Sequence, residues 1–145
     1  MKQLHIPSTA TIEHSVLAAA AALVLALLLT YIINAKIKVN YDKRWKELQK
    51  LLGNKSSWNQ AVIEADKLLD QLLKKKHYKG KTMGERLVAA QHELTANDMV
   101  WFSHKLTNKI KNDGLKPNKN EIKKCLLGFW QALKDLGAFN GNKDE

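Results

Sequence analysis

"SSWNQAVIEADKLLDQLLKKKHYKG", Ser56 to Gly80, is the stretch on which the expected fold rests. Its apolar residues recur at intervals of three and four, which places them on one side of a helix and predicts a single buried stripe. They are Trp58, Ala61, Val62, Ala65, Leu68, Leu69, Leu72 and Leu73. Ser56 or Ser57 is the expected N-terminal cap, and Gly80 lies beyond the C-terminal end. Such an amphipathic helix needs partners along its apolar side.

Three segments after this stretch have the same helical periodicity. Residues 82–95 open with Thr82 and Glu85, the spacing of a capping box, and Leu87, Ala90 and Leu94 face one way. Residues 97–112 form the next expected helix, which Gly114 and Pro117 end; its predicted core residues are Met99, Phe102, Leu106 and Ile110. The last helix begins after Asn118 or Asn120 and closes at Gly137; its predicted core residues are Ile122, Cys125, Leu126, Phe129, Leu133 and Leu136.

A fifth helix is expected before these four, over "NYDKRWKELQKLLG", starting at Asn40 or Tyr41 and stopping at Gly53. No stretch alternates as a half-buried strand should. Short connections between amphipathic helices imply antiparallel neighbours. The predicted fold class is therefore all-α: one N-terminal transmembrane helix, then a cytosolic antiparallel helical bundle of four to five helices.

The transmembrane helix is predicted from "VLAAAAALVLALLLTYII", Val16 to Ile33. Eighteen helical residues span about 27 Å, close to the thickness of the hydrocarbon core of a bilayer. The alternative is a cleaved signal peptide, whose apolar region runs only about 7 to 15 residues and ends at a small-x-small site. The run here is longer, and "INA" at Ile33 to Ala35 puts a bulky residue in that site. These features favour a retained anchor.

The orientation follows from the basic residues that flank the span, because they are retained on the cytoplasmic side. Lys2 alone precedes it, whereas Lys36, Lys38, Lys43, Arg44 and Lys46 follow it. The expected arrangement is a short extracytoplasmic N-terminus (1–14), a transmembrane helix (15–35), a juxtamembrane linker helix (36–55), a cytoplasmic bundle (56–139) and a disordered tail (140–145). The net charge of +10 lies entirely after residue 35, where 23 basic residues face 13 acidic ones.

The cysteine and histidine content restricts the chemistry. A single cysteine, Cys125, excludes an intrachain disulfide and sits at the edge of a predicted core stripe as a small buried hydrophobe. The five histidines have no metal-ligand spacing, and the glycines at Gly80 and Gly84 do not form a phosphate loop. We therefore expect no metal site and no cofactor.

A resemblance to known proteins rests on three stretches: "WNQAVIEADKLLD" (58–70), "YKGKTMGERL" (78–87) and "WFSHKLTNKI" (101–110). Over residues 58–139 the chain resembles a group of uncharacterised bacterial proteins that pair one N-terminal span with a cytosolic helical domain. That domain is in turn similar to HEPN domains, many of which are metal-independent ribonucleases. The resemblance implies a bacterial inner-membrane location.

HEPN ribonucleases resemble one another through an Arg, a polar residue and, a few positions on, a His. The His moves a proton at the ribose, and the Arg stabilises charge on the phosphate. The resemblance places the Arg position on Thr107, the polar position on Asn108 and the His position on Asn112. Threonine supplies no fixed charge and asparagine does not titrate near neutral pH, so both chemical roles are vacant. His104 and Lys111, two turns apart, could mimic a His and cation pair.

An interaction face is predicted on the same helix, opposite the Met99, Phe102, Leu106, Ile110 stripe. Its residues are Trp101, His104, Lys105, Asn108, Lys111 and Asn112. Exposed aromatic residues flanked by polar groups often mark interfaces, and Val100 would extend the apolar patch. The alternative is that Trp45, in the juxtamembrane helix, covers Trp101. Both interpretations stay open at this point.

A basic patch is predicted from "KKKHYKGK", residues 74–81, together with the lysines that follow the span. Its members are Lys36, Lys38, Lys43, Arg44, Lys74, Lys75, Lys76, Lys79 and Lys81. Clustered lysines attract anionic lipid headgroups or RNA phosphates. The alternative is that cations simply stabilise the C-terminal end of a helix. Glu64, Asp66 and Asp70, which cluster on one helix, are expected on a solvated face.

The predicted function combines these features. The protein is expected to be a non-catalytic, membrane-anchored interaction or scaffold protein that binds a copy of itself or another protein. Its expected partners are membrane lipids, through the span and anionic headgroups, and protein. The alternative is a membrane-tethered RNA-binding protein or HEPN-type ribonuclease.

Overall fold

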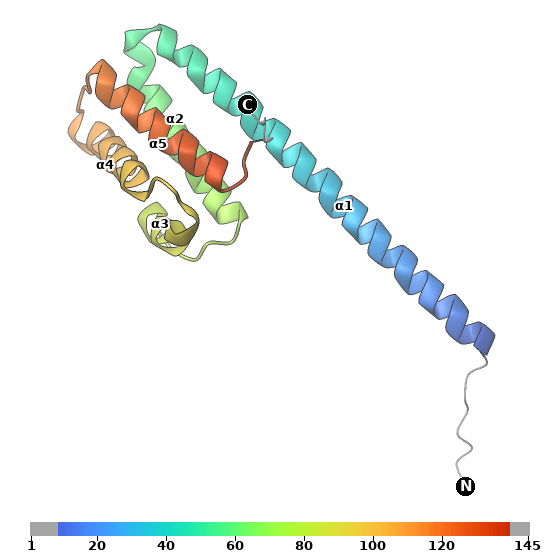
Figure 1. The fold of residues 1–145 in the computed structure, drawn as a ribbon. Coiled ribbons are helices and arrows are strands. Elements are labelled where there is room, and N and C mark those ends of the chain that lie inside the picture. Colours follow the sequence, from blue (N-terminus) through green and yellow to red (C-terminus); the bar gives the residue numbers. More distant parts are fainter. Residues whose placement is uncertain (1–8, 140–145) are drawn as a thin grey trace. The chain divides into compact units, whose positions relative to one another are not determined.

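The structure, a computed structural model, describes residues 9–139, and its side chains are described for 13–36 and 40–139. Within that range the chain is helical and contains no strand (Figure 1). Its α-helices are α1 (Thr9–Lys50), α2 (Trp58–Lys75), α3 (Met83–Ala90), α4 (Asn97–Asp113) and α5 (Lys119–Asp135). Short 3-10 turns cover Leu51–Gly53, Lys55–Ser57 and Gln91–Glu93. The chain divides into two compact units after Lys36. The predicted tail, 140–145, lies outside the described residues.

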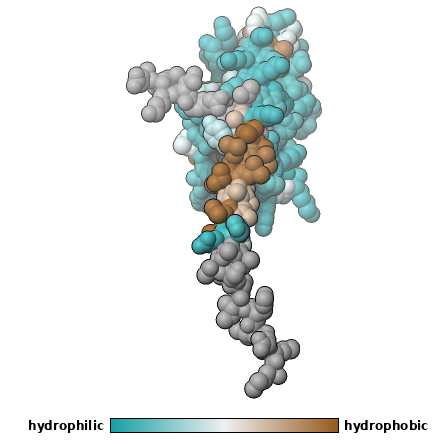
Figure 2. All heavy atoms as spheres, turned by 90° about the vertical axis from the view of Figure 1, so that its right-hand side faces the viewer, coloured by the Kyte–Doolittle hydropathy of each residue, from teal (hydrophilic) through white to brown (hydrophobic). Residues whose placement is uncertain are grey.

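The first unit is the N-terminal part of α1, and its apolar side chains are exposed all round the helix. Leu17, Leu23 and Leu27 keep 67%, 67% and 69% of their surface exposed. The apolar residues of this segment appear as the brown surface in Figure 2. By length and composition this helix can cross a membrane, a property that a signal sequence near the N-terminus shares.

Helix α1 does not stop where the predicted span ends. The prediction of a separate linker helix starting at Asn40 or Tyr41 is wrong, because α1 runs without a break from Thr9 to Lys50. No glycine or proline lies between Ile33 and Lys50, so no residue interrupts the helix. The predicted stop at Gly53 matches the 3-10 turn that follows α1. The C-terminal part of α1 belongs to the second unit, where Tyr41, Trp45 and Leu48 are buried.

Helix α2 is central to the second unit and packs against α3, α4 and α5. The predicted stripe is confirmed from Ala61 to Leu73, and each of its apolar members is buried. Trp58, at the first position, is only half-buried; its indole Nε1 donates a hydrogen bond to the Leu52 carbonyl at 3.1 Å. The helix ends at Lys75, and His77 adopts a left-handed conformation with φ 62°.

The ends of the other helices follow the predicted capping residues. The Thr82 hydroxyl accepts the Glu85 N–H at 3.2 Å, although the Glu85 carboxylate accepts from the Lys81 N–H instead of closing the box on Thr82. Asn118 forms a complete capping box with Glu121 at the start of α5. Gly114 and Gly137 take positive φ values of 64° and 72° after α4 and α5, as only glycine does without strain. The core residues predicted for the segment 82–95 and for α5 are buried.

The predicted stripe of α4 is only partly correct. Leu106 and Ile110 are buried, but Met99 and Phe102 are half-buried. Val100, Ser103 and Thr107 are fully buried instead, so the expectation that Val100 extends an exposed patch is wrong. Helix α4 packs against α2 on one side and α5 on the other, which buries a wide face. Serine and threonine enter that face because their hydroxyls bond to backbone carbonyls within it.

Gly128 lets α5 approach α4 closely. A Cβ atom at Gly128 would lie 2.7 Å from the Met99 carbonyl oxygen and would also clash with the Ser103 hydroxyl. Ser103 Oγ itself lies 2.7 Å from the Met99 carbonyl oxygen and 2.8 Å from that of Cys125, so its proton is shared between the two helices. The backbone of α4 cannot move aside without breaking these contacts.

Gly128→Ala should therefore destabilise the second unit by about 1 to 3 kcal/mol, the usual cost of overpacking a well-filled core. Gly84→Ala is the matched control, since its Cβ would meet the Trp101 ring at an ordinary 3.7 Å; in the first turn of α3 it should change the unfolding free energy by less than about 1 kcal/mol. Chemical unfolding of the full chain in detergent, followed by tryptophan fluorescence, measures both. Equal unfolding free energies for the two variants would contradict the close approach.

Candidate functional site

A buried carboxylate joins α2 to α4. The Asp66 side chain on α2 is 6% exposed, and its Oδ1 lies 2.8 Å from His104 Nδ1 while its Oδ2 lies 2.9 Å from Lys111 Nζ. The expectation that Asp66 lies on a solvated face is wrong. Its two partners are two helical turns apart on α4, so one carboxylate reaches both. We refer to Asp66, His104 and Lys111 as the Asp66 cluster.

The Asp66 cluster fixes the orientation of the His104 ring. A carboxylate accepts hydrogen bonds, so Nδ1 carries a proton, and in the neutral form of the ring Nε2 is the acceptor. Nε2 lies 3.4 Å from the side-chain nitrogen of Asn108, one turn later on the surface of α4. The Trp101 ring meets the imidazole edge-on at a centroid distance of 6.2 Å. A histidine held in this way presents a fixed acceptor near the surface, which is the geometry of a general base or of a rigid polar contact.

Trp101 is covered by α3 and not by Trp45. Its ring packs over Gly84, 3.7 Å from where a Cβ atom would stand, and it remains half-buried. Trp45 instead lies against Phe139, at a centroid distance of 6.1 Å. Val88, one turn after Gly84 on α3, is 52% exposed. An apolar patch therefore remains beside Trp101 even though Val100 is buried.

The six predicted face residues fall on one side of α4, but they differ in role. Trp101 and the Asp66 cluster members His104 and Lys111 are anchored by the contacts above. The other three are exposed on the surface: Lys105, Asn108 and Asn112. We refer to the surface formed by Val88, Trp101, Lys105, Asn108 and Asn112 as the α3–α4 face.

Thr107, the position that the resemblance assigns to a nuclease arginine, lies inside the core. It is 0% exposed, and its hydroxyl donates to the Ser103 carbonyl at 2.9 Å. The Cys125 thiol lies 3.7 Å from the same Ser103 carbonyl oxygen and is buried, as predicted. Burial raises the pKa of the Cys125 thiol to about 12, so no thiolate is present at neutral pH. This part of α4 serves packing against α5.

A second carboxylate joins α2 to α3. Asp70 Oδ1 accepts from Arg86 Nε at 2.9 Å and Nη2 at 2.5 Å, and its Oδ2 lies 2.6 Å from Lys74 Nζ. Arg86 is buried and also donates to the Gly80 carbonyl at 2.7 Å. Burial alone would raise the pKa of Asp70, but the hydrogen bonds from Lys74 and Arg86 outweigh it and hold the pKa below the ordinary value. Of the three acidic residues expected on a solvated face, only Glu64 is there, paired with Lys67 at 2.8 Å.

The predicted basic patch is divided by the structure. Arg44 donates a hydrogen bond to Gln71, and Lys74 is paired with Asp70. Lys36 is exposed in the first unit, Lys43 is exposed in the second, and Lys38 lies outside the described side chains. Lys75, Lys76, Lys79 and Lys81 are exposed and form no ion pair within the described part of the chain. No group of His, Cys, Asp and Glu among the described residues has the arrangement to hold a metal ion.

Comparison with known proteins adds no relative: no family model matches the chain, and searches of curated proteins and of solved structures give no significant match. The resemblance to HEPN domains therefore stays a prediction.

Asp66→Asn should destabilise the second unit by about 2 to 4 kcal/mol, because it removes the counter-charge of Lys111 and weakens the hydrogen bond of His104 at a buried carboxylate. Glu64→Gln, on the same helix, breaks an exposed pair and should cost less than about 1 kcal/mol. Unfolding of both variants by denaturant measures the difference. Similar small losses would mean that Asp66 contributes no more than a surface residue does.

Asp70 predicts how stability responds to acid. Its folded pKa is lower than the ordinary 3.8, so the ionised carboxylate stabilises the fold above that pH and the contribution is lost as the pH falls through the folded pKa. Asp70→Asn should lie below the parent in unfolding free energy by a constant gap near neutral pH. That gap should close at pH values below about 4. A gap that widens in acid would reverse the assigned sign.

Proposed function

We propose that this protein is a single-span membrane protein whose helical domain binds protein through the α3–α4 face. The observation that carries the membrane anchor in this proposal is the apolar surface of α1. All its large apolar side chains from Val16 to Ile33 are exposed, and no charged residue lies between Glu13 and Lys36. Such a helix is apolar on every side, and water is a poor solvent for it.

The flanking charges support an N-terminus outside and a helical domain in the cytoplasm of a bacterium, held at the inner membrane. Lysines and arginine follow the span from Lys36 onward, while Lys2 alone precedes it. Because short basic flanks are retained on the cytoplasmic side, the second unit stays inside. The role proposed for it is that of a non-catalytic helical bundle serving as an interaction or scaffold domain.

The composition of the α3–α4 face supports protein binding. An aromatic ring and an exposed valine lie at its centre, and Lys105, Asn108 and Asn112 form a polar rim. Aromatic centres with polar rims are the common anatomy of interfaces. Asp66 holds the side chains of His104 and Lys111 in place beside this surface, so these two side chains lose little freedom when a partner binds.

A second copy of the chain is the partner we propose. Copies anchored in one bilayer share an orientation and a plane, which raises their effective concentration. The overall charge of +10 opposes self-association, but Asp66 offsets the Lys111 charge close to this face. The face is therefore less repulsive to a copy of itself than the lysine-rich end of α2 would be.

Self-association can be tested on the full chain in detergent micelles by size-exclusion chromatography with light scattering. The parent should be a dimer or larger, and both Trp101→Glu and Val88→Glu should shift it to a monomer, because a charge at the centre of an apolar contact is costly. Val88→Glu covers the case in which Trp101→Glu fails to fold. Leu127→Glu is the control, since Leu127 is 51% exposed on α5 and outside the α3–α4 face.

A parent that is monomeric, or variants that all associate equally, would contradict this proposal.

A second candidate function is metal-independent RNA cleavage, and the observation that favours it is the His104 ring held by Asp66 with Nε2 near the surface. RNA cleavage by the parent in the presence of a chelator, abolished in His104→Ala and kept in Lys105→Ala, would favour this second function.

A further inference from the structure

Four lysines at the C-terminal end of α2 have no charged partner within the described residues. They are Lys75, Lys76, Lys79 and Lys81, and we refer to them as the α2-end lysines. Lys75 lies in the last turn of α2, where the helix dipole favours a cation. Lys79 and Lys81 lie beyond that turn, so the dipole does not account for them. Their positive charge needs another explanation.

The carboxylates nearest in sequence form no ion pair with the α2-end lysines. Asp70 is held by Arg86 and Lys74. The Glu85 carboxylate accepts the backbone N–H of Lys81 at 2.6 Å, and Glu93 is hydrogen-bonded to Tyr78, where it adds to the effect of burial in raising the pKa of the phenol to about 12. An anionic surface that meets this end of α2 therefore finds exposed ammonium groups.

The register within the second unit shows which end of it the α2-end lysines occupy. Arg44 is hydrogen-bonded to Gln71, and further along Leu51 and Glu64 line the same shallow groove. A later residue of α1 thus lies beside an earlier residue of α2, so the C-terminal part of α1 runs antiparallel to α2. Continuing this register brings the end of α2 to the level of about Asn40. The α2-end lysines thus lie where the chain enters the second unit.

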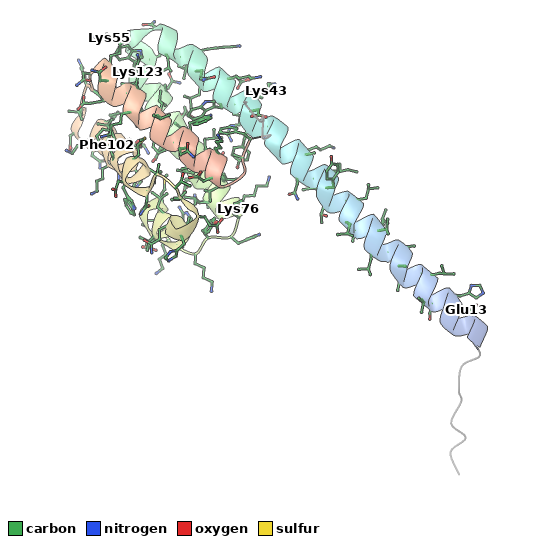
Figure 3. The ribbon with its side chains drawn as sticks, viewed as in Figure 1. Glu13, Lys43, Lys55, Lys76, Phe102 and Lys123 are labelled. Atoms are coloured by element: carbon green, nitrogen blue, oxygen red, sulfur yellow. The ribbon has the colours of Figure 1, made fainter. Side chains whose placement is uncertain are left out.

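The covalent chain keeps this end of the second unit close to the span. Asn40 follows Ile33 by seven positions, which limits the distance between their Cα atoms to roughly 25 Å even if the chain is fully extended. The opposite end of α2 is separated from this end by about 27 Å of helix. Lys55 and Lys116 lie at that far end, where they line one cleft. Figure 3 shows Lys55 and Lys76 at opposite ends of the second unit.

We propose that the α2-end lysines bind the anionic headgroups of the membrane that holds the span, so that the C-terminal end of α2 faces the bilayer. This inference rests on the proposed membrane anchor. An anionic leaflet attracts each nearby lysine by a factor of about five in the binding equilibrium, within about a Debye length of the surface. The lysines and the leaflet are tethered within reach of each other, whereas RNA phosphates would have to be recruited from solution. Headgroup binding orients the second unit and leaves its far end towards the cytoplasm.

The test uses the full chain in nanodiscs of phosphatidylcholine, with or without an equal amount of phosphatidylglycerol. An amine-reactive reagent labels the lysines, and mass spectrometry measures the rate at each one. In anionic discs at low salt the α2-end lysines should react about fivefold more slowly than in neutral discs, and about 1 M salt should remove the difference. Lys55 and Lys116 are internal controls of the same residue type and should react equally in both discs.

Paired variants sharpen the result. Lys76→Glu with Lys79→Glu should remove the protection of Lys75 and Lys81, whereas Lys55→Glu with Lys116→Glu makes the same charge change at the far end and should preserve it. Equal rates in both discs, or equal protection at both ends, would overturn headgroup binding. Protection by added single-stranded RNA in place of anionic lipid would overturn it in favour of RNA.

The proposed anchor has its own readout. The full chain should float with phosphatidylcholine vesicles after an alkaline wash, which removes proteins held by charge alone. Flotation together with equal labelling at both ends would reject headgroup binding and keep the anchor. Loss of flotation would reject the anchor and, with it, the inference that depends on it.

Discussion

The apolar side chains of α2 must be shielded from water, and the other helices of the second unit pack around α2 to do so. Leu68, Leu69 and Leu73 have almost no exposed surface, which requires contacts from α3, α4 and α5 as well as from the C-terminal part of α1. Removing this apolar surface from water is the main favourable contribution to folding. The aromatic residues Trp45 and Phe139 close the core beside α1 and after α5.

Two carboxylates at the edge of the apolar stripe decide which helices lie beside α2. Asp66 accepts from side chains of α4, and Asp70, one turn later, accepts from Arg86 of α3. A buried charge without a partner is costly, so alternative placements of α3 or α4 that separate these groups are disfavoured. The pairs formed by Asp66 and Asp70 thus select one placement of α3 and α4 more than they add to the free energy of unfolding. Asn97 Oδ1 is the buried side-chain atom without a partner among the described residues.

The surfaces of the two units differ in chemical character: one is apolar and the other is positively charged. The first exposes an apolar helix without charged residues along the predicted span, and the second carries nearly all of the positive excess. A bilayer with an anionic inner leaflet suits both, since its interior accepts the first and its surface attracts the second. If the α2-end lysines rest on the leaflet, the protein needs no large interface to be held in one orientation. The α3–α4 face would then be presented in the same way by every copy in the membrane.

Local patterns in the sequence by themselves determined the helices, their caps and most of the core. The stripe of α2, the caps at Thr82 and Asn118 and the terminators Gly114 and Gly137 depend on residues within a turn or two of one another, so periodicity and capping chemistry predict them. The apolar character of Val16–Ile33 is likewise a property of composition. The continuity of α1 through Asn40 was missed, although the absence of a helix breaker there was a usable signal.

Only the tertiary structure decided which face of α4 is buried, because its neighbours on both sides admit Ser103 and Thr107 into the core. It also decided the Asp66 cluster, whose partners lie 38 and 45 residues away in the chain. No local pattern encodes a distance of that kind, and a buried carboxylate can be told from a solvated one only by the side chains that meet it.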